Sequence, residues 1–356
     1  MTSTLSQPSD IAESMGASFA ATGASQTRGK RIGDREKTAA RLLRSSVERV
    51  YDAEVDIDWD EPWAEGKTFG PTHRLSLYGT RIWDKLSPEQ RVELSRHELA
   101  SIFSFGLFAE CMLSSGLFRQ ILAHGYATDT TRYALAEIGD ETRHSTMFSR
   151  AINKLGVAPY QLPSAMTRIA GVGLYLIPLG PSMHGGTLLI EEILDRLQRE
   201  ATIDENVQPH LRQLFKIHVL EEARHITFAR EELVRSYQAC GRAARAFHRF
   251  ILATMAWGVY PTLVNPLVYR NVLGMSPLRG MLASLLNPRY AENAKFAAEP
   301  MVRFFHEVGM VEGRFTTRVW RAARMLPDDL HEEIFGEPPT TKTSWFKRVL
   351  GRAVGV

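Results

Sequence analysis

The sequence contains very little cysteine and no concentration of charge of one sign. Cys111 and Cys240 are the only cysteines in 356 residues, so neither a disulfide framework nor a cysteine-ligated metal site is expected. The formal net charge is only +3, and lysine and arginine are spread along the chain, which argues against a nucleic-acid-binding surface. A reduced, cytoplasmic setting fits this composition best.

We expect neither a secretory signal nor an uninterrupted membrane-spanning run in this sequence. Residues 1–34 are rich in Ser, Thr, Ala and Gly, without a cationic start and an apolar core, and we expect a disordered tail there. The apolar stretch Ile251–Val268 approaches the ~18 residues that a membrane span requires, but Pro261, Asn265 and Pro266 interrupt it. We therefore expect a kinked core helix there and no stable membrane insertion.

No convincing alternating pattern of strands occurs, and helical signals dominate the chain. The clearest helix start is Ser87-Pro88-Glu89-Gln90, where serine caps, proline takes the first helical position and glutamine completes a capping box. The sequence predicts an all-α domain over residues 35–335, irregular surface chain within it at 55–77, and a basic, frayed tail over 336–356. The main helices are expected over 34–51, 87–117, 129–156, 181–200, 209–238 and 287–308.

Two Glu-x-x-His pairs are the most informative feature of the chain. Glu141 precedes His144 and Glu222 precedes His225, and each pair lies 31 residues after another glutamate. On a helix, positions i and i+3 share a face, so each pair directs a carboxylate and an imidazole at one point. Four helices that contribute Glu, Glu-x-x-His, Glu and Glu-x-x-His describe a ferritin-like four-helix bundle that binds two iron or manganese ions.

The ligand types suit such a centre chemically. Carboxylates are hard, anionic and able to bridge two cations, whereas imidazole suits iron. We expect Glu141 and Glu222 to bridge the two ions, the upstream glutamates Glu110 and Glu191 to bind terminally, and each histidine to complete one ion's shell. Without metal, four buried carboxylates would repel one another, and their pKa values would rise.

Two of these assignments have competitors nearby in the sequence. Glu98 lies in a more charged stretch than Glu110 and breaks the 31-residue spacing. Glu191 has a less charged helix face than Glu192 and keeps the spacing. We therefore favour Glu110 and Glu191 as ligands, and we expect Glu192 to be solvated or to support the site.

Two further residues stand one helical turn before the central glutamates. His218 precedes Glu222 by four residues and shares its face, so we expect it to bind metal rather than to be an ordinary core histidine. Glu137 precedes Glu141 in the same way. A second extra ligand would overcrowd the site, so we favour a role for Glu137 outside the ligand set.

Acids directly before the central glutamates suggest a supporting network. Asp140 and Glu221 are rotated about 100° from their neighbours on the helix and could accept the second ring N–H of a histidine on a facing helix. Arg143 and Arg224, three residues later, would then anchor these acids. Simple exposed ion pairs between the acids and the arginines are the alternative.

These residues resemble the p-aminobenzoate N-oxygenase (AurF-like) family of di-iron oxygenases. Paired Glu-x-x-His also occurs in ferritins, rubrerythrins, desaturases and ribonucleotide reductase small subunits, and the extra histidine is what resembles the N-oxygenases in particular. The resemblance is carried by Phe108–Glu110, Glu137–Phe148, Glu191–Asp195, and His218 with Glu222 and His225. It implies seven metal ligands and no further catalytic residue, namely Glu110, Glu141, His144, Glu191, His218, Glu222 and His225.

The resemblance implies an enzyme, a monooxygenase with two iron ions, or manganese in their place, that activates dioxygen. Its substrate would be a small amine of the arylamine type, oxidised at nitrogen toward a hydroxylamine, nitroso or nitro product. We expect an external electron donor and a homodimer. Between Glu98 and Phe118 the first site helix carries no basic residue to pair with a substrate carboxylate, so aminobenzoate itself is not transferred as the substrate.

Two other functions fit the same residues. A di-iron oxidase or hydroxylase acting on C–H bonds would need the same ligands. A non-catalytic, ferritin-like iron-binding or ferroxidase protein would need them as well. Ferritin-like storage requires assembly into a cage, and this chain is about twice as long as a single bundle needs.

Overall fold

The computed structural model describes residues 32–48, 50–162, 164–176, 178–339 and 345–356, so the tail expected over 1–34 lies almost wholly outside the described residues. Within the described residues, the chain is almost entirely helical, and the single extended contact is an isolated parallel bridge between Thr68 and Val207. The predicted all-α fold class, a ferritin-like bundle with additional helices, is confirmed.

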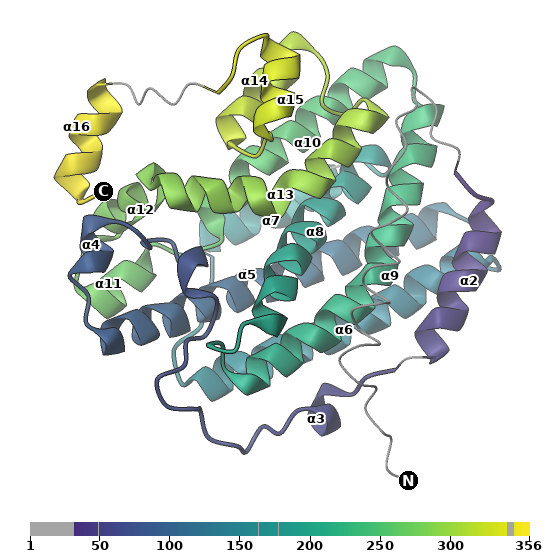
Figure 1. The fold of residues 1–356 in the computed structure, drawn as a ribbon. Helices are drawn as coiled ribbons and strands as arrows, with labels where there is room; N and C mark the ends of the chain where they lie inside the picture. The colour runs from purple at the N-terminus through teal and green to yellow at the C-terminus, as the bar shows by residue number, and fades with distance from the viewer. Residues whose placement is uncertain (1–31, 49, 163, 177, 340–344) are drawn as a thin grey trace. The chain divides into compact units, whose positions relative to one another are not determined.

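Four long helices position the candidate site: α5 (Pro88–Ala123), α6 (Asp129–Leu155), α8 (Pro181–Ile203) and α9 (Pro209–Ala239). Helix α5 packs along α6, and α8 packs along α9 (Figure 1). The capping box forms as expected, because Ser87 Oγ accepts from the backbone N–H of Gln90 and the Gln90 side chain accepts from the backbone N–H of Ser87. Helix α6 ends at Gly156, whose φ of 67° favours glycine.

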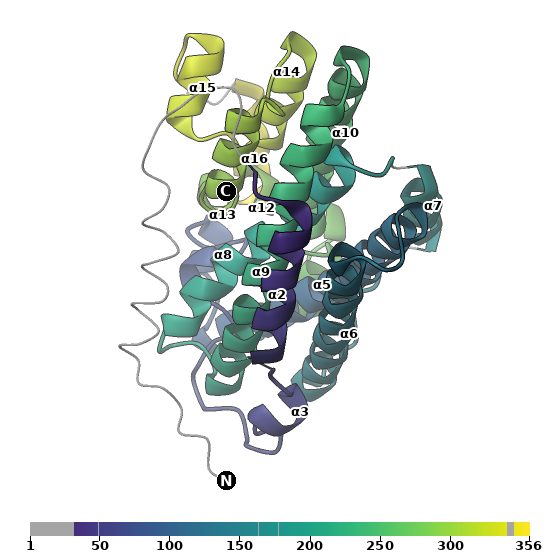
Figure 2. The ribbon, with the colours of Figure 1, turned by 90° about the vertical axis from the view of Figure 1, so that its right-hand side faces the viewer.

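Helices outside this set pack against the two helix pairs. Helix α2 (Arg35–Glu48) lies along α6 and α9 (Figure 2), where Arg35 pairs with Glu232 at 2.8 Å. Glu36 accepts from the backbone N–H of Asp129 at 2.7 Å, so a carboxylate stabilises the positive end of the α6 dipole. Helices α10 (Arg242–Thr262) and α13 (Pro288–Val308) pack against α8, and α11 (Leu267–Leu273) packs against α5.

Short elements complete the described chain. They are α3 (Ala53–Asp56), η2 (Thr72–Arg74), α4 (Arg81–Asp84), α7 (Ser164–Leu176), α12 (Pro277–Leu286), α14 (Arg314–Ala323), α15 (Asp328–Phe335) and α16 (Trp345–Val354). Helix α7 contacts α5, and α16 contacts α12. The stretch for which we expected a frayed basic tail therefore contains a packed helix.

Two expectations about segments outside the bundle are wrong in part. The segment 55–77 is irregular outside η2 and the end of α3, as expected, but it is not confined to the surface, because Phe69, Leu75 and Leu77 are buried in the main hydrophobic core. Instead of one kinked helix over 251–268, α10 ends at Thr262 and α11 begins at Leu267. Asn265 and Pro266 lie in the connection, where proline cannot donate a helical hydrogen bond.

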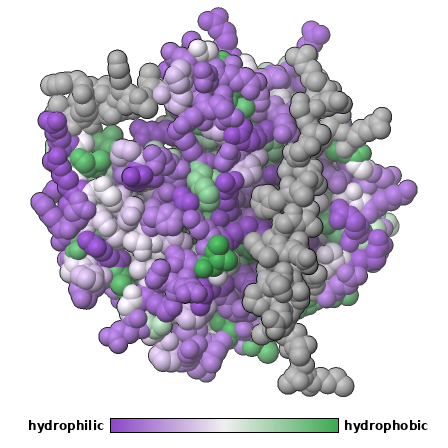
Figure 3. All heavy atoms as spheres, in the orientation of Figure 1, coloured by the Kyte–Doolittle hydropathy of each residue, from purple (hydrophilic) through white to green (hydrophobic). Residues whose placement is uncertain are grey.

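Two helical runs, Pro88–Ala123 and Arg242–Leu273, are long and apolar enough to cross a membrane by length and composition alone. Core helices of soluble proteins pass the same test. The first run buries Glu98 and Glu110, and both runs pack against other helices. On the face in Figure 3, hydrophilic residues predominate and the hydrophobic ones of the described chain form small separate patches. The first run is a bundle helix, and the second, which comprises α10 and α11, packs against the bundle.

Candidate metal centre

All seven residues expected to bind metal meet in one buried cluster. Each is at most 2% exposed. Ligand atoms of Glu110, His144, His218 and Glu222 lie within 4.8 Å of one another. Ligand atoms of Glu141, His144, Glu222 and His225 also lie within 4.8 Å of one another, and so do carboxylate oxygens of Glu141 and Glu191. The bundle therefore brings the seven side chains together, as the spacing predicted. That they bind metal remains a prediction.

The histidine of each helix pair faces the central glutamate of the other pair. His144 Nδ1 lies 3.1 Å from Glu222 Oε1, and His225 Nδ1 lies 2.9 Å from Glu141 Oε1. His218 Nε2 lies 3.5 Å from Glu222 Oε1 and 3.6 Å from an oxygen of Glu110. These contacts place the two central glutamates between the imidazoles, as bridging ligands require.

The outer ring nitrogens of two histidines point to acids on the facing helix. His144 Nε2 lies 2.9 Å from Glu221 Oε2, and His225 Nε2 lies 3.2 Å from Asp140 Oδ2. An N–H donated outward leaves Nδ1 free to face the cluster and fixes the ring orientation. The predicted cross-helix support of the histidines is confirmed.

Two arginines hold these outer acids. Arg143 pairs with Asp140 and lies 3.2 Å from Glu221, and Arg224 lies 2.9 Å from Asp140. Burial would raise the pKa of Asp140, but its hydrogen bonds with His225 and Arg224 keep that pKa well below its usual value. Since both acids are at most 5% exposed, the alternative of simple surface ion pairs is wrong.

Burial and mutual repulsion set the protonation of the cluster. Burial, with repulsion from the central glutamates, raises the pKa of Glu110 and of Glu191 well above the usual value. Burial and Glu141 favour a higher pKa for Glu222, but His225, His218 and His144 outweigh them and hold this pKa at about 2. Burial alone would lower the pKa of His225, but the carboxylates of Glu222, Glu141 and Glu137 outweigh burial, so this pKa is raised. Ions entering the cluster would therefore displace protons.

Unpaired buried atoms show that the cluster fits bound cations. Neither carboxylate oxygen of Glu191 has a hydrogen-bond partner, and neither ring nitrogen of His218 has one. One oxygen of Glu110 is also unpaired, whereas Glu141 Oε1 and the two oxygens of Glu222 meet only histidines of the cluster. Each such group costs about 1–3 kcal/mol when left unsatisfied. A donor set of carboxylates and imidazoles suits iron or manganese, and a pair of these ions would satisfy the unpaired atoms.

Three other glutamates near these positions differ in their surroundings. Glu192 pairs with Arg230, whose Nε lies 2.7 Å from Glu192 Oε1, so Glu191 alone of the two joins the cluster. Glu98 is buried away from the cluster and accepts from the backbone N–H of Ser76 at 3.0 Å. Glu137 was expected to stay outside, but a carboxylate oxygen of Glu137 lies within 4.8 Å of those of Glu141 and Glu191.

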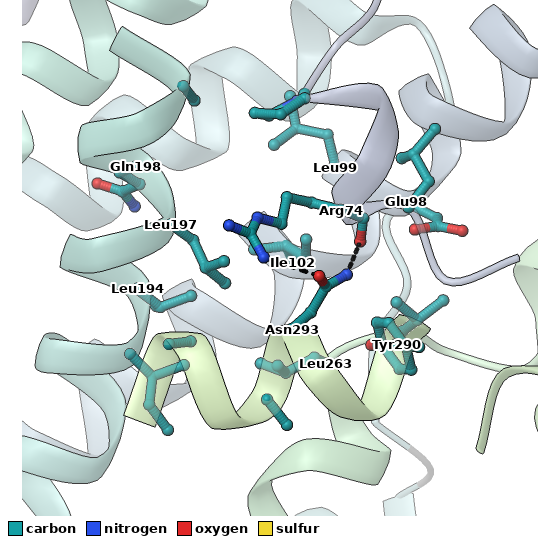
Figure 4. A pocket seen from close by; sticks show the side chains of 18 of the residues that line it. Arg74, Glu98, Leu99, Ile102, Leu194, Leu197, Gln198, Leu263, Tyr290 and Asn293 are labelled. Carbon is teal, nitrogen blue, oxygen red and sulfur yellow. Dashed lines mark hydrogen bonds between the residues drawn. The ribbon is translucent and has the colours of Figure 1, made fainter. Parts of the chain in front are cut away.

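A cavity of about 110 Å³ is lined mainly by apolar side chains of the segment around η2 and of α5, α8 and α13 (Figure 4). It reaches Leu194 and Phe215, which stand one helical turn from Glu191 and His218. Aromatic rings lie against one of the cluster histidines: Phe103 stacks on Phe148 at 5.0 Å, and the Phe148 ring lies 4.9 Å from that of His218.

The charged groups that line the cavity are paired within the protein. Arg74 Nε lies 2.6 Å from Glu200 Oε2, and Arg74 Nη1 donates to Asn293 Oδ1 at 2.8 Å, as Figure 4 shows for the second contact. Glu98, the one carboxylate in the lining, is held by Ser76. Sequence reasoning missed this cavity, because its walls come from segments between Phe69 and Met325 that carry no common motif.

Comparison with known proteins supports the resemblance drawn from the motifs. The family model described as p-aminobenzoate N-oxygenase AurF matches residues 33–309, which include all seven cluster residues. Three uncharacterized proteins, one from Mycobacterium bovis and two from strains of Mycobacterium tuberculosis, are each 30% identical over 200 residues. The match covers 54% of this chain and 59% of each relative, so it spans little more than half of either length.

Proposed function

The chain belongs to the p-aminobenzoate N-oxygenase AurF family, and from that premise we propose that it is a dioxygen-dependent di-iron oxygenase acting on the nitrogen of a small amine. The observation that carries the proposal is the buried cluster of glutamates and histidines with unpaired ligand atoms. Iron is the metal we propose, and N-oxidation is the reaction.

The protein's own residues have distinct roles in this proposal. Two bound iron ions would supply the electrons and open coordination positions that dioxygen activation requires. Glu141 and Glu222 would span both ions, and Asp140 and Glu221 would keep two imidazoles oriented by holding their outer N–H groups. The Phe103 and Phe148 rings exclude water beside the cluster, which strengthens electrostatic interactions within it.

The apolar cavity supports a small, uncharged substrate. An apolar cavity of about 150 Å³ holds benzene, so a space of this order accepts one small ring after slight expansion. No unpaired cation lines it among the described residues, because Arg74 is neutralised by Glu200. We propose that the ring of a neutral arylamine lies here with its amine toward Leu194 and Phe215, and that a carboxylated amine is disfavoured because its charge would be buried unpaired.

One substrate distinguishes the proposed reaction from its alternatives. Iron-loaded, chemically reduced protein is mixed with oxygen and 4-methylaniline, and the products are identified by mass spectrometry. We expect hydroxylamine, nitroso or nitro products, and turnover of 4-aminobenzoate at least about tenfold slower, as one unpaired buried charge would cause. Methyl or ring hydroxylation would instead support a C–H oxidase, and iron oxidation without organic product would support a ferroxidase.

Three further properties belong to the same proposal. We propose an external electron donor, because a di-iron centre must be re-reduced in each turnover. We propose a cytoplasmic location, in keeping with the low cysteine content. We also propose that the protein is a homodimer. Light scattering coupled to size-exclusion chromatography tests the dimer, and a monomer mass would contradict it.

A further inference from the structure

Glu137 occupies in one half of the cluster the place that His218 occupies in the other. Glu137 stands four residues before Glu141 on α6, and His218 stands four residues before Glu222 on α9. Residues four apart on a helix lie on the same face, one turn from each other. The two Glu-x-x-His helices therefore carry matching third positions that differ only in side-chain chemistry.

The geometry of the two positions is also matched across the cluster. His218, from α9, has a ring nitrogen 3.6 Å from the terminal glutamate of the other helix pair, Glu110 on α5. Glu137, from α6, has a carboxylate oxygen within 4.8 Å of an oxygen of Glu191, the terminal glutamate on α8. Each extra residue thus faces the terminal glutamate contributed by the opposite pair.

One oxygen of the buried Glu137 carboxyl group has no hydrogen-bond partner. Glu137 is only 2% exposed, and its Oε2 atom has no hydrogen-bond partner. The hydroxyl of Tyr133, one turn earlier, is buried and also unpaired, so it does not serve as that partner. The side chains within 4.8 Å of its carboxylate, Glu141 and Glu191, are acids, and the charge that attracts it is that of the cluster histidine His225. A buried acid among acids is stable only with a cation or a proton.

We propose that Glu137 is an eighth metal ligand, bound to the ion that Glu191 binds, as the counterpart of His218 on the ion that Glu110 binds. This inference rests on the proposed di-iron function. With both central glutamates bridging, each ion would receive a terminal glutamate, one histidine of a Glu-x-x-His pair, two bridging oxygens and one extra residue. That number stays within the about six donors of an octahedral ion and leaves room for oxygen, so overcrowding does not arise.

The consequence is a pair of chemically unequal ions. The ion beside Glu110 would have two imidazoles, whereas the ion beside Glu191 would have one imidazole and an additional carboxylate. Anionic oxygen ligands favour harder, more highly charged cations than imidazole does. The two places should therefore differ in affinity, and each should respond to the loss of its own extra residue.

Metal titration of the full-length protein tests the assignment. Metal-depleted wild type, Glu137→Gln and the control Glu192→Gln are titrated with Mn²⁺ and followed by electron paramagnetic resonance, which separates coupled pairs from single ions. Glu192 is a matched control because it is a buried acid on the same bundle that pairs with Arg230. We expect wild type and Glu192→Gln to bind a coupled pair. Glu137→Gln should bind its second ion at least about tenfold more weakly, a loss typical of altered metal surroundings.

A second measurement separates ligation from a structural role. The unfolding midpoint of each protein is measured with and without Mn²⁺, and Glu137→Asp is added as a variant that keeps the carboxylate. A ligand role predicts that the metal-induced rise in midpoint shrinks in Glu137→Gln and partly returns in Glu137→Asp. His218→Gln should weaken binding of the other ion to a similar extent.

The outcomes distinguish this inference from the proposed function. If wild type binds no ion pair, the proposed function fails, and the inference fails with it. If wild type binds a pair and Glu137→Gln binds both ions with wild-type affinity, the inference is overturned while the proposed function stands. A metal-induced rise that is unchanged in Glu137→Gln would likewise show that Glu137 is only a buried structural acid.

Discussion

Buried charges occur in two neighbouring regions, the metal cluster and the apolar cavity, and their surroundings differ. In the cavity, Arg74 is held by Glu200 and Asn293, and Glu98 is held by Ser76. In the cluster, by contrast, both carboxylate oxygens of Glu191 lack partners, and those of Glu222 meet only histidines of the cluster. Charged groups whose hydrogen bonds are all made within the protein have a structural role, whereas buried groups left without partners indicate a place where a ligand binds.

The largest test of this contrast is the loss of a central carboxylate. We expect Glu222→Gln to lower iron affinity and N-oxidation by more than about 100-fold, the upper end of the loss for residues that only support a ligand. Iron content by elemental analysis and product formation by mass spectrometry measure both effects. Glu200→Gln, which removes a charge already paired at the cavity, should keep its iron. Normal iron content in Glu222→Gln would remove the distinction between the two regions.

The next effect concerns the acids that orient the histidines. Asp140→Asn and Glu221→Gln should each lower metal affinity by about 10–100-fold, because the imidazole loses the charged acceptor of its outer N–H. Titration of metal-depleted protein with Fe²⁺ under anaerobic conditions measures this. The two variants should behave alike, since the cluster halves are matched at this position. A loss in only one of them would show that only one histidine is a ligand.

A smaller effect is expected from Glu98, which lies outside the cluster and should make the stability of the fold depend on pH. Burial, only partly offset by hydrogen bonds from Ser76, raises the pKa of Glu98 from 4.5 to about 7. The neutral form therefore stabilises the folded state fully below pH 4.5, and this stabilisation is lost as the pH rises through about 7. Between pH 5 and 7, metal-depleted wild type should lose about 2 kcal/mol more unfolding free energy than Glu98→Gln. Denaturant unfolding at both pH values measures it, and equal losses would contradict it.

The smallest effect concerns the volume of the cavity. Ala294→Leu would place three more carbons in the lining and should raise KM for neutral arylamines about tenfold, the equivalent of about 1.4 kcal/mol of lost apolar contact. Iron content should be unchanged, because Ala294 lies on α13, outside the cluster. Ala243→Leu on the exposed start of α10 is the control. An unchanged KM would place the substrate elsewhere.

The cluster was predictable from sequence because its geometry is local and periodic. A three-residue step fixes which side chains share a helix face, and equal spacing from Glu110 and Glu191 relates the pairs. The same reasoning favoured Glu191 over Glu192 by the charge on each face, and Glu191 is the one whose carboxylate joins the cluster. The place of the Glu137 carboxylate beside Glu141 and Glu191 did not follow from counting ligands.

Features that depend on contacts between distant segments were not predictable in this way. Phe69, Leu75 and Leu77 lie in a segment without periodic pattern, yet they are buried against the bundle. The cavity combines residues of this segment with residues of α13, more than two hundred positions later. Burial of this kind follows from tertiary packing, which propensity and pattern do not encode.

The origin of the cavity walls separates two tasks of the molecule. Every cluster residue belongs to one of the four long helices, whereas a large part of the lining comes from the chain around η2 and from α13. Mutations in those outer segments can reshape the chamber without moving a single ligand. A different lining, and with it a different substrate, is therefore open to relatives through changes in these segments alone, while the cluster stays the same.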